Sequence, residues 1–134
     1  MMQFFLDNIV LVLIIVVSAG ALVFPYFAKR GAGPEISVKE AVLLINKQNA
    51  LMIDVRKPEE YRRGHIAQAV NIPADVIQGR IGDLPKDRPI ILVDASGAGS
   101  RAVARLLRGV GLQQTSILDG GLFAWAKEKM PLES

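Results

Sequence analysis

Residues 54–73 read D-V-R-K-P-E-E-Y-R-R-G-H-I-A-Q-A-V-N-I-P, and this stretch contains the boundaries of three short elements. The apolar run at 50–55, A-L-M-I-D-V, is typical of a buried strand that ends within it. Proline suits the first turn of a helix, so Pro58 followed by two glutamates predicts a short helix. Residues 69–72 predict a second, weaker strand that ends at Pro73. A strand, a helix and a strand in this order indicate an α/β fold.

The remainder of the sequence continues this alternation of strands and helices. Ser37 with Glu40 three residues later forms a capping box at the start of a helix. Further strands are expected at 89–94 and 115–118, and helices at 101–110 and 121–129. We therefore expect a mostly parallel sheet flanked by helices on both faces. Ligands of such sheets bind at the carboxyl ends of the strands, where Asp54 and Asp94 are placed.

The charge balance and the cysteine count exclude several functions. A net charge of +3 that is spread along the chain gives no patch basic enough to indicate nucleic-acid binding. The chain has 134 residues and no cysteine, which excludes disulfides, thiolate metal sites and a cysteine nucleophile. We expect no metal ion and no other cofactor.

An uncharged run of twenty residues, 9–28, follows the first eight residues. At about 1.5 Å per residue this run extends roughly 30 Å, the thickness of the hydrocarbon core of a bilayer. The aromatic pair at 26–27 and the basic pair at 29–30 suit the membrane interface. A cleaved signal peptide is the alternative, because 19–21 resembles a cleavage site, but no basic residue precedes the run. We expect a retained single-span anchor.

The sequence thus predicts four parts: a short tail over 1–8, a transmembrane helix over 9–28, a hinge over 29–34 and a globular domain over 35–134. Because the basic pair follows the span, the positive-inside rule places the globular domain in the cytoplasm. The hinge is too short to hold the domain far from the bilayer. The lipid bilayer is therefore the first expected partner, through residues 9–28.

Two separated stretches resemble the signatures of rhodanese domains. Residues 54–73 resemble the first signature, which reads D-x-R, then E-[YF]-x-x-G-H-I, then A-x-N-I-P. Residues 118–131, L-D-G-G-L-F-A-W-A-K-E-K-M-P, resemble the closing signature L-x-G-G-x-x-x-W-x-x-x-x-x-P. The resemblance covers roughly residues 35–133 and implies the rhodanese fold. An anchor followed directly by such a domain also resembles a group of bacterial inner-membrane proteins, which implies that location.

Polar residues of the first signature have structural interpretations. We expect Asp54 and Arg56 to form a charge-assisted pair beside the loop. His65 is expected to hydrogen-bond the backbone and fix the turn rather than to act as a base. Gly64 and residues 120–121 are expected where the backbone needs a positive φ or a close approach. These residues would therefore support the site rather than react in it.

The loop after the strand at 89–94 departs from the family. The resemblance implies a loop C-x-x-G-x-R, whose cysteine carries sulfane sulfur and whose N–H groups stabilise the persulfide. Alignment on the strand and on Gly97 places Asp94 at the cysteine and Gly99 at the arginine. Alignment shifted by one places Ala95 at the nucleophile, with Arg101 at the six-residue offset of phosphatase relatives. The nucleophile is absent in both alignments.

Asp94 therefore needs an interpretation of its own. We favour internal capping, in which its carboxylate accepts hydrogen bonds from the loop N–H groups and fills the anion site. An aspartyl-phosphate acceptor would need a magnesium-binding carboxylate cluster, which the sequence does not offer. Ser96 and Ser100 lack an evident base, and we expect Ser100 to cap the following helix. The candidate binding loop comprises Asp94, Ala95, Ser96, Gly97, Ala98, Gly99, Ser100 and Arg101.

The sequence predicts a membrane-anchored, catalytically inactive rhodanese-like domain that binds or scaffolds membrane-associated partners, such as a membrane-protein complex or an assembly factor. Two alternatives stay open at this point. The loop could bind an anion or a sulfur metabolite without turning it over. Sulfur transfer could also depend on a cysteine that a partner supplies.

Overall fold

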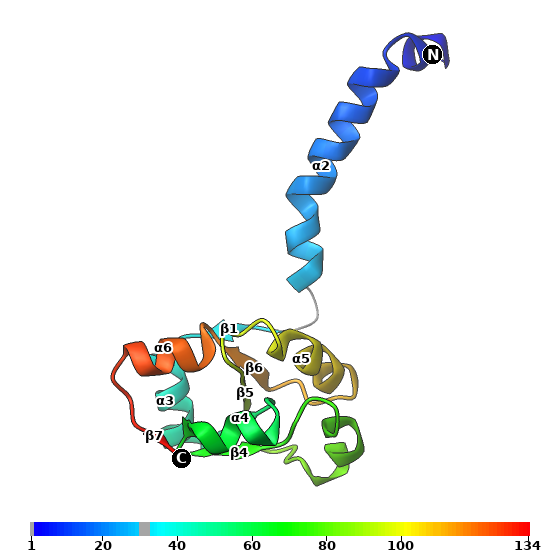
Figure 1. Cartoon of the computed structure of the whole chain (residues 1–134). Coiled ribbons are helices and arrows are strands. Elements are labelled where there is room, and N and C mark those ends of the chain that lie inside the picture. The colour runs from blue at the N-terminus through cyan, green and yellow to red at the C-terminus, as the bar shows by residue number, and fades with distance from the viewer. Residues whose placement is uncertain (1, 30–32) are drawn as a thin grey trace. The chain divides into compact units, whose positions relative to one another are not determined.

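The computed structural model describes residues 2–29 and 33–134, which divide into two units, Met1–Arg30 and Gly31–Ser134. The first unit contains α1 (Met2–Asp7) and α2 (Ile9–Lys29), as Figure 1 shows. The expected tail over 1–8 is thus mostly helical, and α2 matches the uncharged run to within one residue. Most of the expected hinge, 30–32, and the interfacial side chains at 26–30 lie outside the described residues.

Over 2–29 and 33–134, no helix combines the length and the apolarity that crossing a membrane requires.

The second unit is built on a five-stranded parallel sheet with the order β1-β6-β5-β2-β4. These strands are β1 (Glu35–Ile36), β6 (Thr115–Leu118), β5 (Ile90–Val93), β2 (Leu51–Asp54) and β4 (Ala69–Asn71). β5 lies at the centre of the sheet, and all four of its residues are buried. This burial on both faces explains why its sequence, I-I-L-V, is a continuous apolar run without alternation.

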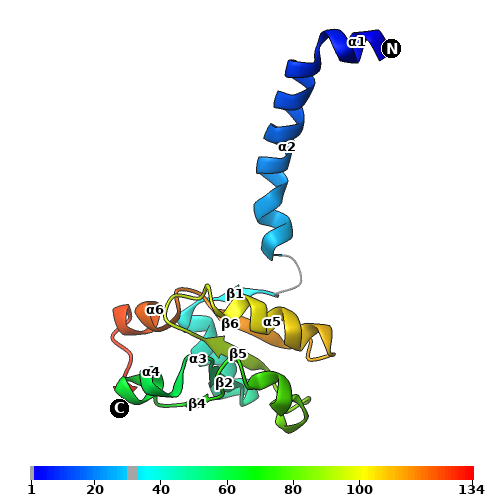
Figure 2. The ribbon, with the colours of Figure 1, turned by 45° about the vertical axis from the view of Figure 1, so that its right-hand side comes forward.

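Helices cover both faces of the sheet (Figures 1 and 2). α3 (Val38–Gln48) and α6 (Gly121–Lys127) pack on one face, where Trp125 is fully buried. α5 (Ser100–Gly109) and the 3-10 helix η1 (Ile77–Asp83) pack on the other face. Neighbouring residues of one strand enter opposite cores, since Met52 faces α3 and Ile53 faces α5. The predicted parallel sheet flanked by helices is confirmed.

The predicted helix start at Ser37 is also confirmed. Ser37 Oγ accepts a hydrogen bond of 3.1 Å from the backbone N–H of Glu40, and Ser37 itself is the N-cap of α3. α4 (Pro58–Arg63) begins at the proline, as expected for a residue without a backbone N–H.

Within residues 33–134, three two-residue strands and one 3-10 helix were not predicted. β1 extends the main sheet, while β3 (His65–Ile66) and β7 (Leu132–Glu133) pair antiparallel in a second sheet. Strands this short have no periodicity to detect, because two residues cannot show alternation. η1 lies in a stretch with two glycines, Gly79 and Gly82, which weaken any helical pattern.

Candidate functional site

The site lies at the carboxyl ends of three neighbouring strands of the sheet. Asp54, the last residue of β2, pairs in register with Val93 of β5, so that Asp94 begins the next loop beside Val55. A pocket of about 420 Å³ opens at this edge. Its lining residues come from the segments after β2, β4 and β5: Val55, Arg56, Lys57, Glu60, Pro73, Ala74, Asp75, Asp94, Ala95 and Gly99.

The carboxylate of Asp94 accepts hydrogen bonds from its own loop. Oδ1 accepts from the backbone N–H of Gly97 at 2.5 Å and from Ser100 Oγ at 3.2 Å. Oδ2 accepts from the backbone N–H of Gly99 at 2.5 Å. The predicted internal capping is therefore confirmed: a carboxylate of the chain itself is bound by donors that point into the loop.

Two glycines permit the close packing around Asp94. A Cβ at Gly99 would lie 2.6 Å from Asp94 Oδ2. Gly121 has a φ of 53°, and a Cβ there would collide with the backbone oxygen of Asp94. The loop is also bonded to α6, because Leu122 N donates to Asp94 O and Phe123 N donates to Ala95 O. The start of α6 therefore holds the backbone of residues 94–95 in place.

Two expectations, one for Ser100 and one for Gly64, were wrong. Ser100 does not cap α5, because the N-cap is Gly99 without a side-chain cap, and the buried Ser100 hydroxyl donates to Asp94 instead. Gly64 has a φ of 168°, which is extended backbone that any residue adopts, and its nearest contact is an ordinary one. The expectation for residues 120–121 is confirmed, with φ values of 75° and 53°.

The remaining residues of the candidate binding loop differ in whether they line the pocket. Ala95 and Gly99 line the pocket, whereas Ser96 and Ala98 are exposed outside its lining and Gly97 is buried. Arg101 points elsewhere, because its Nε lies 3.0 Å from Glu35 Oε1 in an ion pair. An arginine at this offset therefore does not face Asp94.

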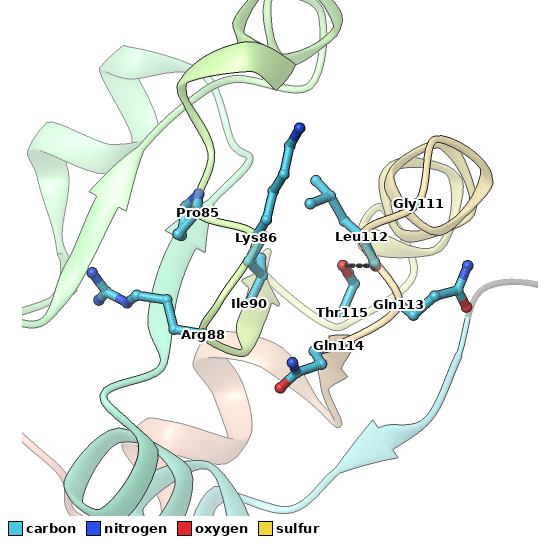
Figure 3. Close-up of a pocket in the computed structure, with 9 residues that line it drawn as sticks. All are labelled: Pro85, Lys86, Arg88, Ile90, Gly111, Leu112, Gln113, Gln114 and Thr115. Carbon is cyan, nitrogen blue, oxygen red and sulfur yellow. Dashed lines mark hydrogen bonds between the residues drawn. The ribbon is translucent and has the colours of Figure 1, made fainter.

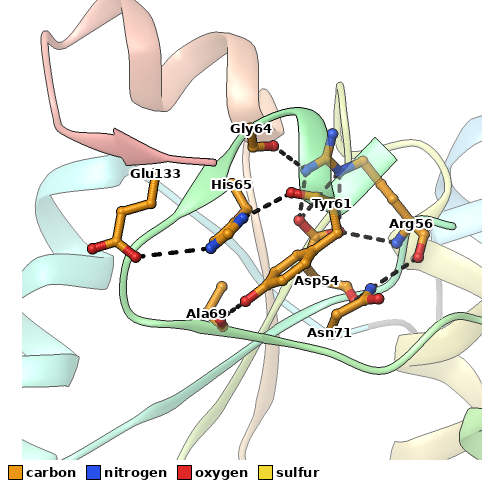
Figure 4. A network of polar contacts seen from close by, with 8 residues as sticks. All are labelled: Asp54, Arg56, Tyr61, Gly64, His65, Ala69, Asn71 and Glu133. Carbon is orange, nitrogen blue, oxygen red and sulfur yellow. Dashed lines mark hydrogen bonds and ion pairs between the residues drawn. The ribbon is translucent and has the colours of Figure 1, made fainter. Parts of the chain in front are cut away.

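A polar network holds the turn that follows β2 (Figure 4). Asp54 is fully buried, and its carboxylate accepts hydrogen bonds from Arg56 N, Nε and Nη2. Arg56 Nη2 also donates to Gly64 O at 2.6 Å. Asn71 Nδ2 bridges the backbone oxygens of Asp54 and Arg56. The expected Asp54–Arg56 pair is confirmed, and its geometry aligns β2, the turn and β4.

Two stacked aromatic rings, those of Tyr61 and His65, also stabilise this turn. His65 stacks on Tyr61 with 3.7 Å between the ring centroids, and its Nδ1 lies 2.7 Å from Tyr61 O. A carbonyl only accepts, so Nδ1 carries the proton, which confirms the backbone bond expected of His65. Tyr61 donates to Ala69 O, and burial raises the pKa of its phenol, with further contributions from Asp54 and Glu133. His65 thus has a structural position away from the pocket.

Sequence reasoning missed three charged residues of the pocket, Lys57, Glu60 and Asp75. Each lies just after β2 or β4, and the rule that ligands bind at carboxyl ends of strands could have indicated them. Over 2–29 and 33–134, no three acidic, histidine or cysteine side chains gather as metal ligands would.

A second, smaller pocket lies at the opposite edge of the sheet (Figure 3). Its volume is about 110 Å³, and its lining comes from the segments that precede β5 and β6. Arg88 Nε donates to Asn49 O at 2.6 Å, and Thr115 Oγ1 donates to Leu112 O at 2.7 Å. The pocket is therefore small, and it shares no lining residue with the pocket beside Asp94.

Comparisons with known proteins agree with this architecture. The model of the rhodanese-like domain matches residues 37–128, and the chain belongs to that family. It is 38% identical over 96 residues to the uncharacterized protein YibN of Escherichia coli K12, covering 69% of this chain and 67% of that protein. It is 33% identical over 89 residues to a protein of Allochromatium vinosum named sulfurtransferase, covering 66% of this chain and 83% of that protein.

A solved structure shows the same fold. The crystal structure of a rhodanese-related protein from Thermoplasma volcanium superposes with a TM-score of 0.69 at 27% identity, covering 75% of this chain and 98% of that chain. The rhodanese fold implied by the two signatures is therefore confirmed.

Proposed function

We propose that this rhodanese-like domain is catalytically inactive and serves as a binding or scaffolding module. The observation that carries the proposal is the occupied loop: Asp94 accepts from Gly97 N, Gly99 N and Ser100 Oγ, in a chain without cysteine. A family loop of this kind stabilises a persulfide with those same N–H groups. In this chain the carboxylate of Asp94 accepts those hydrogen bonds in place of a persulfide.

The chemistry of a carboxylate supports this proposal. Sulfane-sulfur transfer needs a polarizable thiolate that can carry the sulfur atom, and a carboxylate oxygen cannot form a stable persulfide. The charge of Asp94 would also repel an anionic donor such as thiosulfate. Anion binding and transfer through a partner's cysteine find less support, because both would need the N–H groups that Asp94 already engages.

We further propose that residues 9–28 anchor the protein in the bacterial inner membrane, with the domain in the cytoplasm and partners among membrane-associated proteins. The support is the uncharged run of twenty residues and the exposure of its apolar side chains, such as Leu13 at 55% and Val17 at 69%. Exposed apolar surface of this extent requires a covering partner, and lipid is one partner that can cover it.

A thiosulfate:cyanide sulfurtransferase assay on the full chain tests the enzymatic part. We expect no turnover above a no-enzyme control, while a rhodanese with its cysteine turns over in the same buffer. Turnover by this protein would overturn the inactive interpretation.

Alkaline carbonate extraction tests the anchor. We expect the full chain to stay in the membrane pellet, and the variant carrying Ile14→Arg and Val16→Arg to move to the supernatant, because charges near the bilayer centre oppose insertion. Release of the unmodified protein by carbonate would contradict the anchor.

A further inference from the structure

The pocket beside Asp94 carries more negative than positive charge. The guanidinium of Arg56 is compensated by the buried Asp54, 2.8 Å away. Lys57 is then the remaining cation of the lining, against the three carboxylates of Glu60, Asp75 and Asp94. In the described part of the chain, none of these three carboxylates takes part in an ion pair. The pocket therefore favours a cationic occupant, the opposite of what a thiosulfate site needs.

The walls of the pocket are largely apolar. Val55 is buried, and Pro73, Ala74 and Ala95 contribute aliphatic surface next to the charged residues. Lysine and arginine side chains combine an aliphatic stem with a cationic head, so they match a lining of this kind. The volume of about 420 Å³ lies within the range of ligand pockets and holds one such side chain with room to spare.

An exposed aromatic residue is joined through its backbone to the lining of this pocket. Phe123 is 72% exposed, and its backbone N–H donates to the carbonyl of Ala95, which lines the pocket. Aromatic residues are enriched among the residues that dominate protein–protein binding energy. A protein segment can place a cationic side chain in the pocket and an apolar side chain on Phe123 at the same time.

We infer that the pocket formed by Glu60, Asp75 and Asp94 receives a lysine or arginine side chain of a partner protein, and that an apolar residue of the same segment packs on Phe123. This inference rests on the proposed binding function and names the chemistry of the partner. The position that holds sulfane sulfur in catalytic relatives then serves as a receptor for a basic side chain.

The test is an NMR titration of the isotope-labelled full chain in detergent micelles. The first probe is Nα-acetyl-arginine amide, in which the guanidinium is the only charge, and the comparison probes are sulfate and thiosulfate. We expect the arginine probe to shift the amides of Val55, Asp75 and Ala95 in a saturable way, and the two anions to leave them unchanged. Shifts from the anions without shifts from arginine would overturn the inference.

Matched variants test whether the charges of the pocket bind the arginine probe. Asp75→Asn should weaken the arginine probe about two- to fivefold, the usual effect of one exposed charge pair. Asp87→Asn removes the same charge from an exposed position outside the pocket lining and should leave the affinity unchanged. Lys57→Gln should tighten binding by a similar factor. Equal effects of Asp75→Asn and Asp87→Asn would show non-specific attraction and contradict the assigned site.

A set of capped peptides tests the protein nature of the occupant. Each carries one arginine and one leucine, separated by zero to three glycines, and the matched set replaces leucine with glycine. At least one leucine peptide should bind more tightly than its glycine counterpart, and Phe123→Ala should remove this gain without changing the binding of Nα-acetyl-arginine amide. If no leucine peptide gains affinity, the occupant is a small cation and the partner-segment inference is wrong.

These outcomes are separate from those of the sulfurtransferase assay. Arginine binding together with turnover would refute the inactive function and leave the cationic pocket standing. Absence of both would refute the pocket inference alone.

Discussion

The Oδ2 atom of Asp94 lies where a side chain on residue 99 would begin. Gly99 N donates to this oxygen at 2.5 Å, and a Cβ at residue 99 would come within 2.6 Å of it. The alignment on Gly97 with the family loop places a cysteine at position 94 and an arginine at position 99. The structure therefore couples the two departures from the family loop, because the carboxylate needs glycine at 99 to reach its donors.

This coupling predicts that Gly99→Ala destabilises the domain by about 1–3 kcal/mol, the usual cost of forcing extra volume into a packed site. The measurement is the urea unfolding midpoint of the full chain, followed by a tertiary-structure signal such as Trp125 fluorescence. Gly79→Ala is the control, since nothing lies within 4 Å of a Cβ there.

In a background of Asp94→Ala, the same Gly99→Ala change should cost little, because the carboxylate oxygen that it meets is gone. Additive effects of the two changes would contradict the coupling.

Asp94→Cys should allow a persulfide to form on the protein. The thiolate would attack the outer sulfur of thiosulfate, keep that sulfur as a persulfide and release sulfite. Mass spectrometry should then show the gain of one sulfur atom, which the unmodified protein does not show under the same treatment.

Adding Gly99→Arg to Asp94→Cys should raise the rate of persulfide formation about tenfold, as expected if a guanidinium contributes roughly 1.4 kcal/mol to holding the anionic donor. The single change Gly99→Arg should instead destabilise the protein, since Asp94 still occupies the space. A double variant that forms no persulfide would show that more than these two positions has diverged.

Arg56→Ala should cost about 3–5 kcal/mol of unfolding free energy, because it leaves the fully buried carboxylate of Asp54 without its cation. Arg80→Ala is a matched control, since it breaks an arginine–aspartate pair of the same 2.8 Å length whose side chains are 54% and 67% exposed. This control should cost less than about 1 kcal/mol. Denaturant unfolding of both variants checks the contrast, and similar losses would contradict the structural role of the buried pair.

The raised pKa of Tyr61 predicts that the protein loses stability at high pH. Burial raises the pKa of its phenol above the ordinary value of about 10. The folded state therefore holds the proton more tightly than the unfolded state, so this contribution is complete below pH 10 and is lost as the pH rises through the raised pKa. Unfolding free energies measured from pH 8 to 12 should fall less steeply for Tyr61→Phe than for the unmodified protein. Parallel curves would contradict this assignment.

The fold could largely be predicted from the sequence. The buried runs at 50–55 and 89–94 became β2 and β5 because branched apolar residues in a short run can be buried on both faces of a parallel sheet. The capping box at Ser37 needed only a contact three residues away. The two-residue strands β3 and β7 were not predictable. Their pairing joins His65 to Glu133, which are far apart in the sequence, so no local pattern indicates it.

The candidate site could be predicted only in part. The sequence by itself determined the missing nucleophile, since it contains no cysteine, and it determined which loop should be altered, since Asp94 follows the central strand. Only the tertiary structure decided that Arg101 pairs with Glu35 away from the loop, and that Glu60 and Asp75 join Asp94 around one pocket. The physical reason is that these side chains belong to segments far apart in the chain. The meeting of Glu60, Asp75 and Asp94 depends on the register of β2, β4 and β5, which long-range packing sets and no local sequence pattern encodes.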